Sequence, residues 1–231
     1  MTVHLVGAGP GDPGLITVRG LELVRGCDVL VHDRLVAEEL VAEAPGDALV
    51  VARDGLGQDE VSRLLVEFGR AGLEVVRLKG GDPFVYGRGG EEALALADAG
   101  VEVEIVPGVS SLAAVPASAG IPLTHRGVAS EVRVLTGRSA GEEPPAPTVV
   151  VFMGLEAAAD VRDRLLAEGL TPGTPAAVIA SGTTADQDVR IATLGELADA
   201  AADVEPPALL VVGEVVGCRF TAHSALATVE A

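Results

Sequence analysis

The stretch from Val75 to Glu92, VVRLKGGDPFVYGRGGEE, constrains the fold of this chain more than any other segment. An apolar run typical of a buried strand stops at GGDP (80–83), and a helical pattern begins after GG (89–90). Glycines permit backbone angles and close approaches that a Cβ would block, and the proline fixes the exit of the loop. Because α/β proteins place ligands at such strand-to-helix loops, the sequence predicts a binding site here.

Strand-like and helical segments alternate through the first half of the chain. The strands are expected at 3–6, 28–32, 48–52, 74–78 and 101–106, and the helices at 15–24, from after Asp33 to about 44, 58–70, 90–99 and 110–119. This alternation predicts a mostly parallel sheet covered by helices on both faces.

The second half has a different pattern. Strands are expected at 131–136, 147–152, 176–180, 187–192 and 208–213, with helices only near 156–168 and 194–202. Two strands must then follow others without a crossover helix, so we expect a mixed sheet with antiparallel pairs. The segment GRSAGEEPPAP (137–147) is expected to be a polar surface loop.

A break in the alternation at IPLTHRG divides the chain into two predicted domains. We expect an N-terminal α/β domain over 1–120, a linker over 121–129 and a C-terminal α/β domain over 130–231.

Composition limits the partners of the chain. Its net charge of −18 over 231 residues repels phosphate backbones and anionic lipid, so neither nucleic acid nor a membrane surface is expected as a partner. No run approaches the roughly 20 apolar residues that span a bilayer, and no basic leader precedes the first strand, which predicts a cytoplasmic location. Cys27 and Cys218 stand far apart without metal-ligand spacing, so we expect two buried thiols, no disulfide framework and no metal site.

The glycine-rich loop GAGPGDP (7–13) does not fit a dinucleotide site. Pro10 and Pro13 interrupt the stretch in which backbone N–H groups would bind a pyrophosphate. Asp33, which closes the second expected strand, is followed directly by Arg34 and is not an isolated ribose-binding carboxylate.

Four segments together resemble the tetrapyrrole methylase family, in the branch that acts on uroporphyrinogen III. They are HLVGAGPGDPGLIT (4–17), VHDRLV (31–36), LKGGDPFVYGRGGEE (78–92) and VPGVSSLAAVPASAGIPLTHR (106–126). The resemblance implies two αβα domains with the active site in the cleft between them. It also implies a homodimer that methylates uroporphyrinogen III at carbons 2 and 7. The methyl donor would be S-adenosyl-L-methionine, and the products S-adenosyl-L-homocysteine and, through precorrin-1, precorrin-2 for sirohaem and cobalamin.

The resemblance assigns cofactor binding to residues in both halves of the chain. In that family Asp82 would hold the positive end of the methionine part, and Met153 would offer a soft surface to adenine. Taken alone, Met153 is typical of a core methionine, and the serine pair at 110–111 of a helix cap. The implied cofactor-binding residues are Pro10, Gly80, Gly81, Asp82, Val85, Ser110, Ser111, Met153 and Gly182.

Asp33 occupies the position of the family's proposed base. Without the resemblance it would be interpreted as a surface aspartate paired with Arg34. Arginine forks bind carboxylates in bidentate fashion, which suits a substrate with eight carboxylates. The residues expected to contact the substrate are Arg34, Arg53, Arg88, His125 and Arg126.

Two positions depart from the family pattern. Arg53 stands in a shortened loop where the family has its proposed proton-donating lysine, and a guanidinium does not release its proton in proteins. Arg138 replaces a histidine. Two alternatives therefore stay open: methylation of a later corrin precursor, and a degenerate protein that binds tetrapyrrole or cofactor without turnover. At this length we expect no fused dehydrogenase-ferrochelatase or uroporphyrinogen synthase part.

Overall fold

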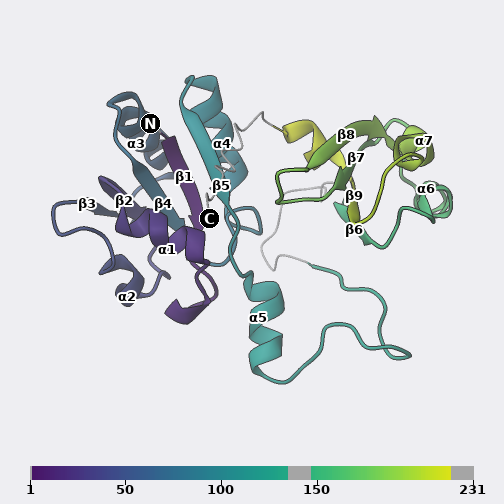
Figure 1. Ribbon diagram of the computed structural model, residues 1–231, viewed down its shortest axis with the longest axis horizontal. Helices are drawn as coiled ribbons and strands as arrows, with labels where there is room; N and C mark the ends of the chain where they lie inside the picture. The colour runs from purple at the N-terminus through teal and green to yellow at the C-terminus, as the bar shows by residue number, and fades with distance from the viewer. Residues whose placement is uncertain (1, 135–146, 220–231) are drawn as a thin grey trace. The chain divides into compact units, whose positions relative to one another are not determined.

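The computed structural model describes residues 2–134 and 147–219 (Figure 1). These residues fall into two compact units, the first within 2–134 and the second within 147–219, each built on its own sheet. The expected loop at 137–147, apart from Pro147, and the departure at Arg138 lie outside the described residues. Between 121 and 134 the backbone forms only an isolated bridge of His125 with Ala129. The proposed linker and domain limits stay predictions.

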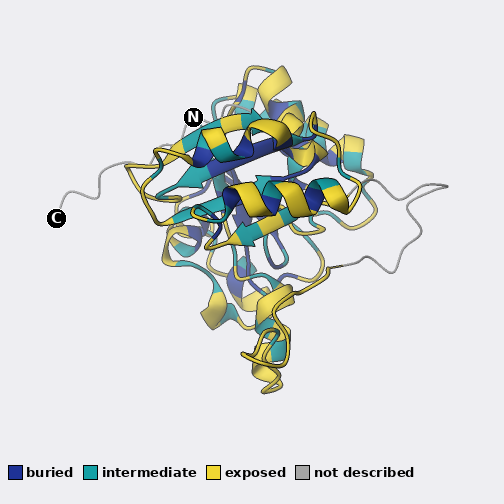
Figure 2. Cartoon of the chain, turned by 90° about the vertical axis from the view of Figure 1, so that its right-hand side faces the viewer, coloured by how far each residue is buried: buried dark blue, intermediate teal, exposed yellow. Residues whose placement is uncertain are grey.

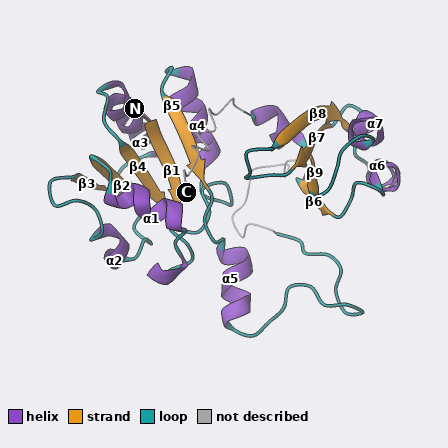
Figure 3. Ribbon diagram, in the orientation of Figure 1, coloured by secondary structure: helices purple, strands orange, loops and turns teal. Residues whose placement is uncertain are grey.

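The first unit contains a five-stranded parallel sheet with the order β3-β2-β4-β1-β5 (Figure 3). Its strands are β1 (Thr2–Gly7), β2 (Val29–His32), β3 (Leu49–Ala52), β4 (Val75–Lys79) and β5 (Glu102–Val106). The helices are η1 (Pro13–Leu15), α1 (Val18–Arg25), α2 (Glu38–Val41), α3 (Gln58–Arg70), α4 (Gly89–Asp98) and α5 (Ser111–Ser118). The predicted alternation is confirmed, although α2 is only one turn long, with no side-chain cap at Ala37.

Each face of this sheet has its own apolar core. Val61 and Leu65 of α3 and Leu96 of α4 pack against one face. Val24 of α1 and Leu40 of α2 pack against the other. The helices following the neighbouring strands β1 and β4 therefore lie on opposite faces, which is the arrangement that opens a ligand crevice at the carboxyl ends of parallel strands.

The second unit is a four-stranded sheet with the order β6-β9-β7-β8. Its elements are β6 (Val149–Phe152), α6 (Ala158–Ala167), β7 (Pro175–Ala180), β8 (Asp188–Thr193), η2 (Leu194–Glu196), α7 (Leu197–Ala201), β9 (Ala208–Val212) and η3 (Glu214–Cys218). Leu165, Leu197 and Leu210 form part of the core beneath α6 and α7. The helices carry exposed residues on their outer sides and buried residues toward the sheets (Figure 2).

The α/β fold class is confirmed, with two differences of detail. All pairs among the four strands placed in 147–219 are antiparallel, whereas a mixed sheet was expected. Residues 131–134 do not form the strand expected at 131–136, because all four are exposed and pair with no neighbouring strand, and 135–136 lie outside the described part. The expectation of two buried thiols is wrong for Cys218, which is exposed, while Cys27 is buried.

No helix placed in 2–134 or 147–219 has the length and apolar character needed to cross a bilayer.

Candidate functional site

Three loops meet at the carboxyl ends of β1, β4 and β5. Gly9 and Gly81 exchange backbone hydrogen bonds, with the N–H of Gly81 2.7 Å from the carbonyl oxygen of Gly9 and the reverse contact at 3.2 Å. A Cβ on Gly108 would lie 2.2 Å from the carbonyl oxygen of Gly81, and one on Gly7 would lie 2.6 Å from it. Gly81 also has a φ of +64°, which a side chain disfavours. The three loops can therefore pack this closely only because positions 7, 81 and 108 are glycines.

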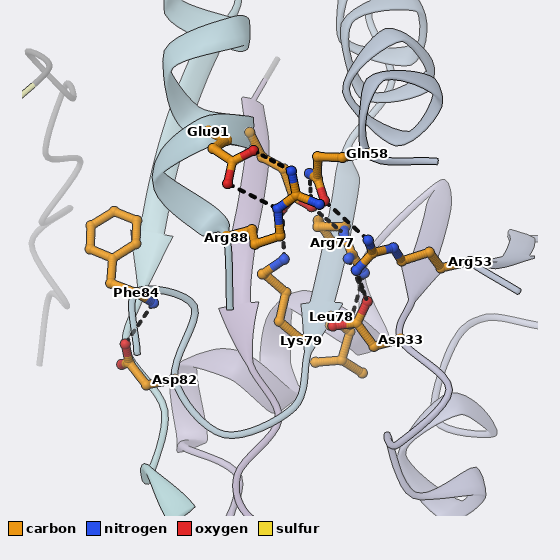
Figure 4. A network of polar contacts seen from close by, with 11 residues as sticks. Asp33, Arg53, Gln58, Arg77, Leu78, Lys79, Asp82, Phe84, Arg88 and Glu91 are labelled. Carbon is orange, nitrogen blue, oxygen red and sulfur yellow. Dashed lines mark hydrogen bonds and ion pairs between the residues drawn. The ribbon is translucent and has the colours of Figure 1, made fainter. Parts of the chain in front are cut away.

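Asp82 joins the loop after β4 to the segment after β5. Its Oδ1 accepts the N–H of Phe84 at 2.8 Å (Figure 4). Its Oδ2 accepts the N–H of Gly108 at 3.1 Å. Each carboxylate oxygen can accept further hydrogen bonds, so these contacts leave room for a cationic ligand group. Asp82 thus has a structural task that the sequence did not reveal, and its role toward a cofactor stays a prediction.

The serine pair lies beside the same loop. Ser110 caps α5, because its Oγ accepts the N–H of Leu112 at 3.3 Å. The backbone N and Oγ of Ser111 would each lie 3.7 Å from a Cβ on Gly81. Pro10 follows Gly9 directly and is half-buried, and Val85 is exposed in the same turn as Asp82, to whose carbonyl oxygen its N–H donates at 3.3 Å. The structure therefore brings together the predicted cofactor residues of the first unit.

Met153 and Gly182 belong to the second unit, and each follows a strand, β6 and β7, that ends at the same end of its sheet. β6 and β7 flank β9, and Phe152 and Ile179 both pair with Leu209. Two strand spacings, or about 10 Å, therefore separate the ends of β6 and β7. Met153 is 94% exposed and has a φ of 54°, so its interpretation as a core methionine is wrong. A left-handed backbone at a residue other than glycine is uncommon and costs free energy.

A cluster of charged side chains, named here the buried charge cluster, lies beside β4. Arg77 and Lys79 of β4 and Glu92 of α4 are all fully buried. Arg77 Nε lies 3.2 Å from Glu92 Oε1, and Lys79 Nζ lies 2.9 Å from Glu92 Oε2 (Figure 4). Removing charges from water is costly unless they are paired and hydrogen-bonded, and here they are.

Asp33 lies at the open side of this cluster, directly after β2. Its Oδ1 is 2.5 Å from Arg77 Nη2 and 3.5 Å from Arg53 Nη1. The interpretation of Asp33 as a surface aspartate paired with Arg34 is therefore wrong. Burial alone raises the pKa of the Asp33 carboxyl, but the charge and hydrogen bond of Arg77, with the charges of Lys79 and Arg53, bring this pKa below its ordinary value. Asp33 is ionised at neutral pH and is able to accept a proton.

The residues expected to contact the substrate are spread over the first unit. Arg53 contacts Asp33, and Arg34, which follows Asp33 in the chain, is exposed. Arg88 precedes α4 and forms an exposed ion pair with Glu91, at 2.6 Å. His125 and Arg126 are exposed on the segment after α5, where the ring Nδ1 of His125 lies 3.0 Å from the carbonyl oxygen of Arg126.

Glu92 and Gln58 were not predicted as site residues. Gln58 Nε2 donates to Glu92 Oε1 at 3.0 Å, and Arg53 Nη2 donates to Gln58 Oε1 at 3.1 Å. A signal was present in the sequence, because Glu92 shares the buried side of α4 with Ala93 and Leu96. A carboxylate in that position needs a buried cation, and the strand before it carries two.

A parallel sheet with packed glycine-rich loops at the carboxyl ends of its strands, and an ionised carboxylate at the same end, is the arrangement typical of an α/β protein that binds a small ligand. Residues 2–198 match the Tetrapyrrole (Corrin/Porphyrin) Methylases, and the chain belongs to this family.

Similar proteins include Siroheme synthase 2 of Aeromonas hydrophila, which is 43% identical over 232 residues covering 94% of this chain and 49% of that protein. The chain thus spans about half the length of the curated relatives it matches. Among solved structures, uroporphyrin-III-C-methyltransferase from Thermus thermophilus is 41% identical, with a TM-score of 0.57 and coverage of 94% of this chain and 93% of that chain. A structure of the Thermus enzyme complexed with S-adenyl homocysteine is 43% identical, with a TM-score of 0.53 and the same coverage.

Proposed function

We propose that this chain transfers methyl groups from S-adenosylmethionine to carbons 2 and 7 of uroporphyrinogen III, giving precorrin-1 and then precorrin-2. Membership of the methylase family and the likeness to the Thermus methyltransferase support the reaction class. The observation that carries the proposal is the placement of Asp33. Arg77 holds its Oδ1 at the carboxyl ends of the parallel strands, where the glycine-rich loops also lie. Sirohaem and cobalamin are the products to which this reaction leads.

The residues around the glycine-rich loops fit S-adenosylmethionine. The structure of the Thermus enzyme complexed with S-adenyl homocysteine supports this choice of cofactor. The loops 7–14 and 80–87 contain no basic residue, so they suit a ligand that carries sulfonium and ammonium groups and not one that carries phosphates. A Cβ on Gly80 would meet nothing closer than Leu35 Cβ at 4.0 Å, which leaves open space beside this loop. The proposed cofactor residues are Pro10, Gly80, Gly81, Asp82, Val85, Ser110, Ser111, Met153 and Gly182.

Two tasks fall to the residues of this chain. S-adenosylmethionine supplies an electrophilic methyl group on sulfur. The protein must hold a pyrrole carbon in line with that methyl, and positioning of this kind contributes up to roughly 7–11 kcal/mol. Arg34, Arg53, Arg88, His125 and Arg126 are the cationic or hydrogen-bonding residues proposed to hold the carboxylates of the substrate. Asp33 then accepts the proton that leaves the ring system after methyl transfer.

Mass analysis of the product tests this function. The chain is incubated with labelled S-adenosylmethionine and enzymatically made uroporphyrinogen III, and gains of one and two methyl groups are expected. A chain that binds S-adenosylhomocysteine in calorimetry but adds no methyl group would be the degenerate binding protein instead. Methylation of a later precursor in preference to uroporphyrinogen III would also overturn the assignment.

We further propose a homodimer in the cytoplasm. Helix α5 buries none of its own residues among those described, and apolar side chains on and beside it are exposed. They are Val109, Leu112, Val115 and Ile121. A second copy of the chain would cover this surface. Light scattering at micromolar concentration tests the dimer, and a monomer mass contradicts it. The two unpaired cysteines agree with a reducing compartment.

A further inference from the structure

Five polar side chains form a closed ring next to β2 and β4. Figure 4 labels four of them, Asp33, Arg53, Gln58 and Arg77. Asp33 contacts Arg77, and Arg77 contacts Glu92. Glu92 accepts a hydrogen bond from Gln58, and Gln58 accepts one from Arg53. An ion pair between Arg53 and Asp33 closes the ring. Both arginines that reach Asp33 are thus tied to Glu92, one directly and the other through Gln58.

Glu92 is the most connected member of this ring. Its Oε1 accepts from Arg77 Nε and Gln58 Nε2, and its Oε2 accepts from Lys79 Nζ at 2.9 Å. The three donors come from β4 and α3, while Glu92 itself lies on α4. Because its side chain has no exposed surface, it cannot contact a substrate. Any effect it has on the reaction must pass through its neighbours.

The neighbour that matters is Asp33. Arg77 uses Nε for Glu92 and Nη2 for Asp33, so the carboxylate of Glu92 fixes the direction in which the guanidinium meets Asp33. Both arginines bind Oδ1 of Asp33, and Oδ2 has no hydrogen-bond partner among residues 2–134 and 147–219. Oδ1 is therefore fixed by the two arginines, while Oδ2 can accept a proton.

Glu92 also sets the charge around Asp33. The charged groups that face Asp33 are Arg77 and Lys79 from β4, Arg53 from the end of β3, and Glu92 from α4. His32 and Arg34 are its neighbours in the chain. Without the negative charge of Glu92, three cations would surround the carboxylate.

We propose that Glu92 is a positioning residue for the methyl transfer, which holds Arg77 and Arg53 so that they bind one oxygen of Asp33 and leave the other free to accept the proton. This proposal rests on the proposed function, because Glu92 acts only through Asp33.

Two substitutions separate geometry from charge. Glu92→Asp keeps the buried charge and withdraws the carboxylate by one methylene. We expect kcat to fall roughly tenfold or more, because small displacements at a reacting centre are costly. Glu92→Gln keeps the length and removes the charge. We expect a similar fall in kcat and, because the more positive surroundings lower the pKa of Asp33, a shift of the acid limb of the kcat profile to lower pH.

The measurements are steady-state kinetics across pH and calorimetry with S-adenosylhomocysteine. The KM for uroporphyrinogen III and the cofactor Kd should stay within about twofold of wild type, a split that general loss of structure would not produce. Asp98→Asn, at the exposed far end of α4, is the matched control and should behave as wild type. If Glu92→Gln does not fold, Glu92→Asp still decides, since it keeps a negative charge among the buried cations.

The outcomes distinguish the two proposals. A normal kcat in Glu92→Asp beside a slow Asp33→Asn variant overturns the role of Glu92 alone. Equal losses in kcat and cofactor affinity in Glu92→Asp do the same. An inactive wild type overturns the proposed function and this inference with it. An Asp33→Asn variant with normal kcat removes Asp33 as the proton acceptor, and with it this inference, but leaves the proposed methyl transfer standing.

Discussion

Lys79 Nζ lies 2.9 Å from Glu92 Oε2, and neither side chain has any exposed surface. Burial, with the neighbouring charge of Arg77, lowers the pKa of Lys79 below its ordinary value. The only lysine of the chain therefore pairs with a carboxylate in the interior and does not reach toward a ligand. Lys79 is the last residue of β4, so this pair fixes the end of the strand from which the loop at 80–83 departs.

Removing the carboxylate of this pair should destabilise the fold more than removing its lysine. Glu92→Leu leaves Arg77 and Lys79 buried without their shared carboxylate and should cost roughly 3–5 kcal/mol of unfolding free energy. Lys79→Met should cost clearly less, because Glu92 keeps its contacts with Arg77 and Gln58. Urea unfolding at equilibrium measures both variants. Equal losses would mean that Glu92 is not the centre of the cluster.

Asp33 gives a prediction for the rate. Asp33→Asn removes the proposed proton acceptor and should slow kcat by roughly 10²–10⁴-fold. Affinity for S-adenosylhomocysteine should barely change, because the loops at Gly9 and Gly81 do not depend on this side chain. Since Arg77 holds the pKa of Asp33 below the usual range, the wild-type rate should show no acid limb from this group until the pH falls below about 3.9. A near wild-type rate in the variant would refute the assignment.

Asp82 gives a prediction for cofactor binding. Asp82→Ala removes a carboxylate from the loop and also its hydrogen bonds to the N–H groups of Phe84 and Gly108. We expect weaker binding of S-adenosylhomocysteine with the sheet intact, measured by calorimetry and circular dichroism. Asp28→Ala is the control, because Asp28 also accepts a backbone N–H, that of Glu74 at 2.8 Å, but lies before β2, at the opposite end of the sheet. Unchanged affinity in Asp82→Ala would remove this residue from the site.

His4 predicts a dependence of stability on pH. Its ring lies between two carboxylates, with Nδ1 2.7 Å from Glu104 Oε2 and Nε2 3.1 Å from Glu74 Oε2. Both nitrogens can donate only when the imidazole is protonated. Burial acts to lower the pKa of His4, but the hydrogen bonds and charges of Glu104 and Glu74 raise it above 6.5.

The sign of the His4 effect follows from this shift. A raised folded-state pKa stabilises the fold fully below about pH 6.5, and the stabilisation is lost as the pH rises through the folded-state value. Wild-type unfolding free energy should therefore decline over that interval, and His4→Gln should remove the decline. Parallel curves for the two proteins would show that His4 does not titrate in the fold.

The sequence was sufficient for the strands of the first unit and for the loop at 80–83, because hydrophobic period and glycine chemistry are local properties. It was not sufficient for the partners. Arg77 meets Asp33 because β2 and β4 are neighbours, and nothing near either residue specifies that order of strands. A pattern alone also misled at 131–134, where alternating side chains have no neighbouring strand to pair with.

The sequence also did not predict the backbone conformation of individual residues. The exposure of Met153 overturns its interpretation as a core side chain, and its left-handed φ is a conformation that no sequence rule assigns to methionine. Ser110, in contrast, caps α5 as its residue type predicts.

The contact among Gly7, Gly81 and Gly108 restricts how this protein could be altered by directed evolution. A methyl group on Gly7 or Gly108 collides with the backbone of another loop, so neither tolerates replacement unless the backbone shifts. Randomised libraries that include these positions would consist largely of misfolded members. The tip of the neighbouring loop, at Phe84, Val85 and Tyr86, is exposed and lies outside this contact. A library confined to this tip, with Val85 kept as a proposed cofactor residue, would leave the packing of the three glycines unchanged.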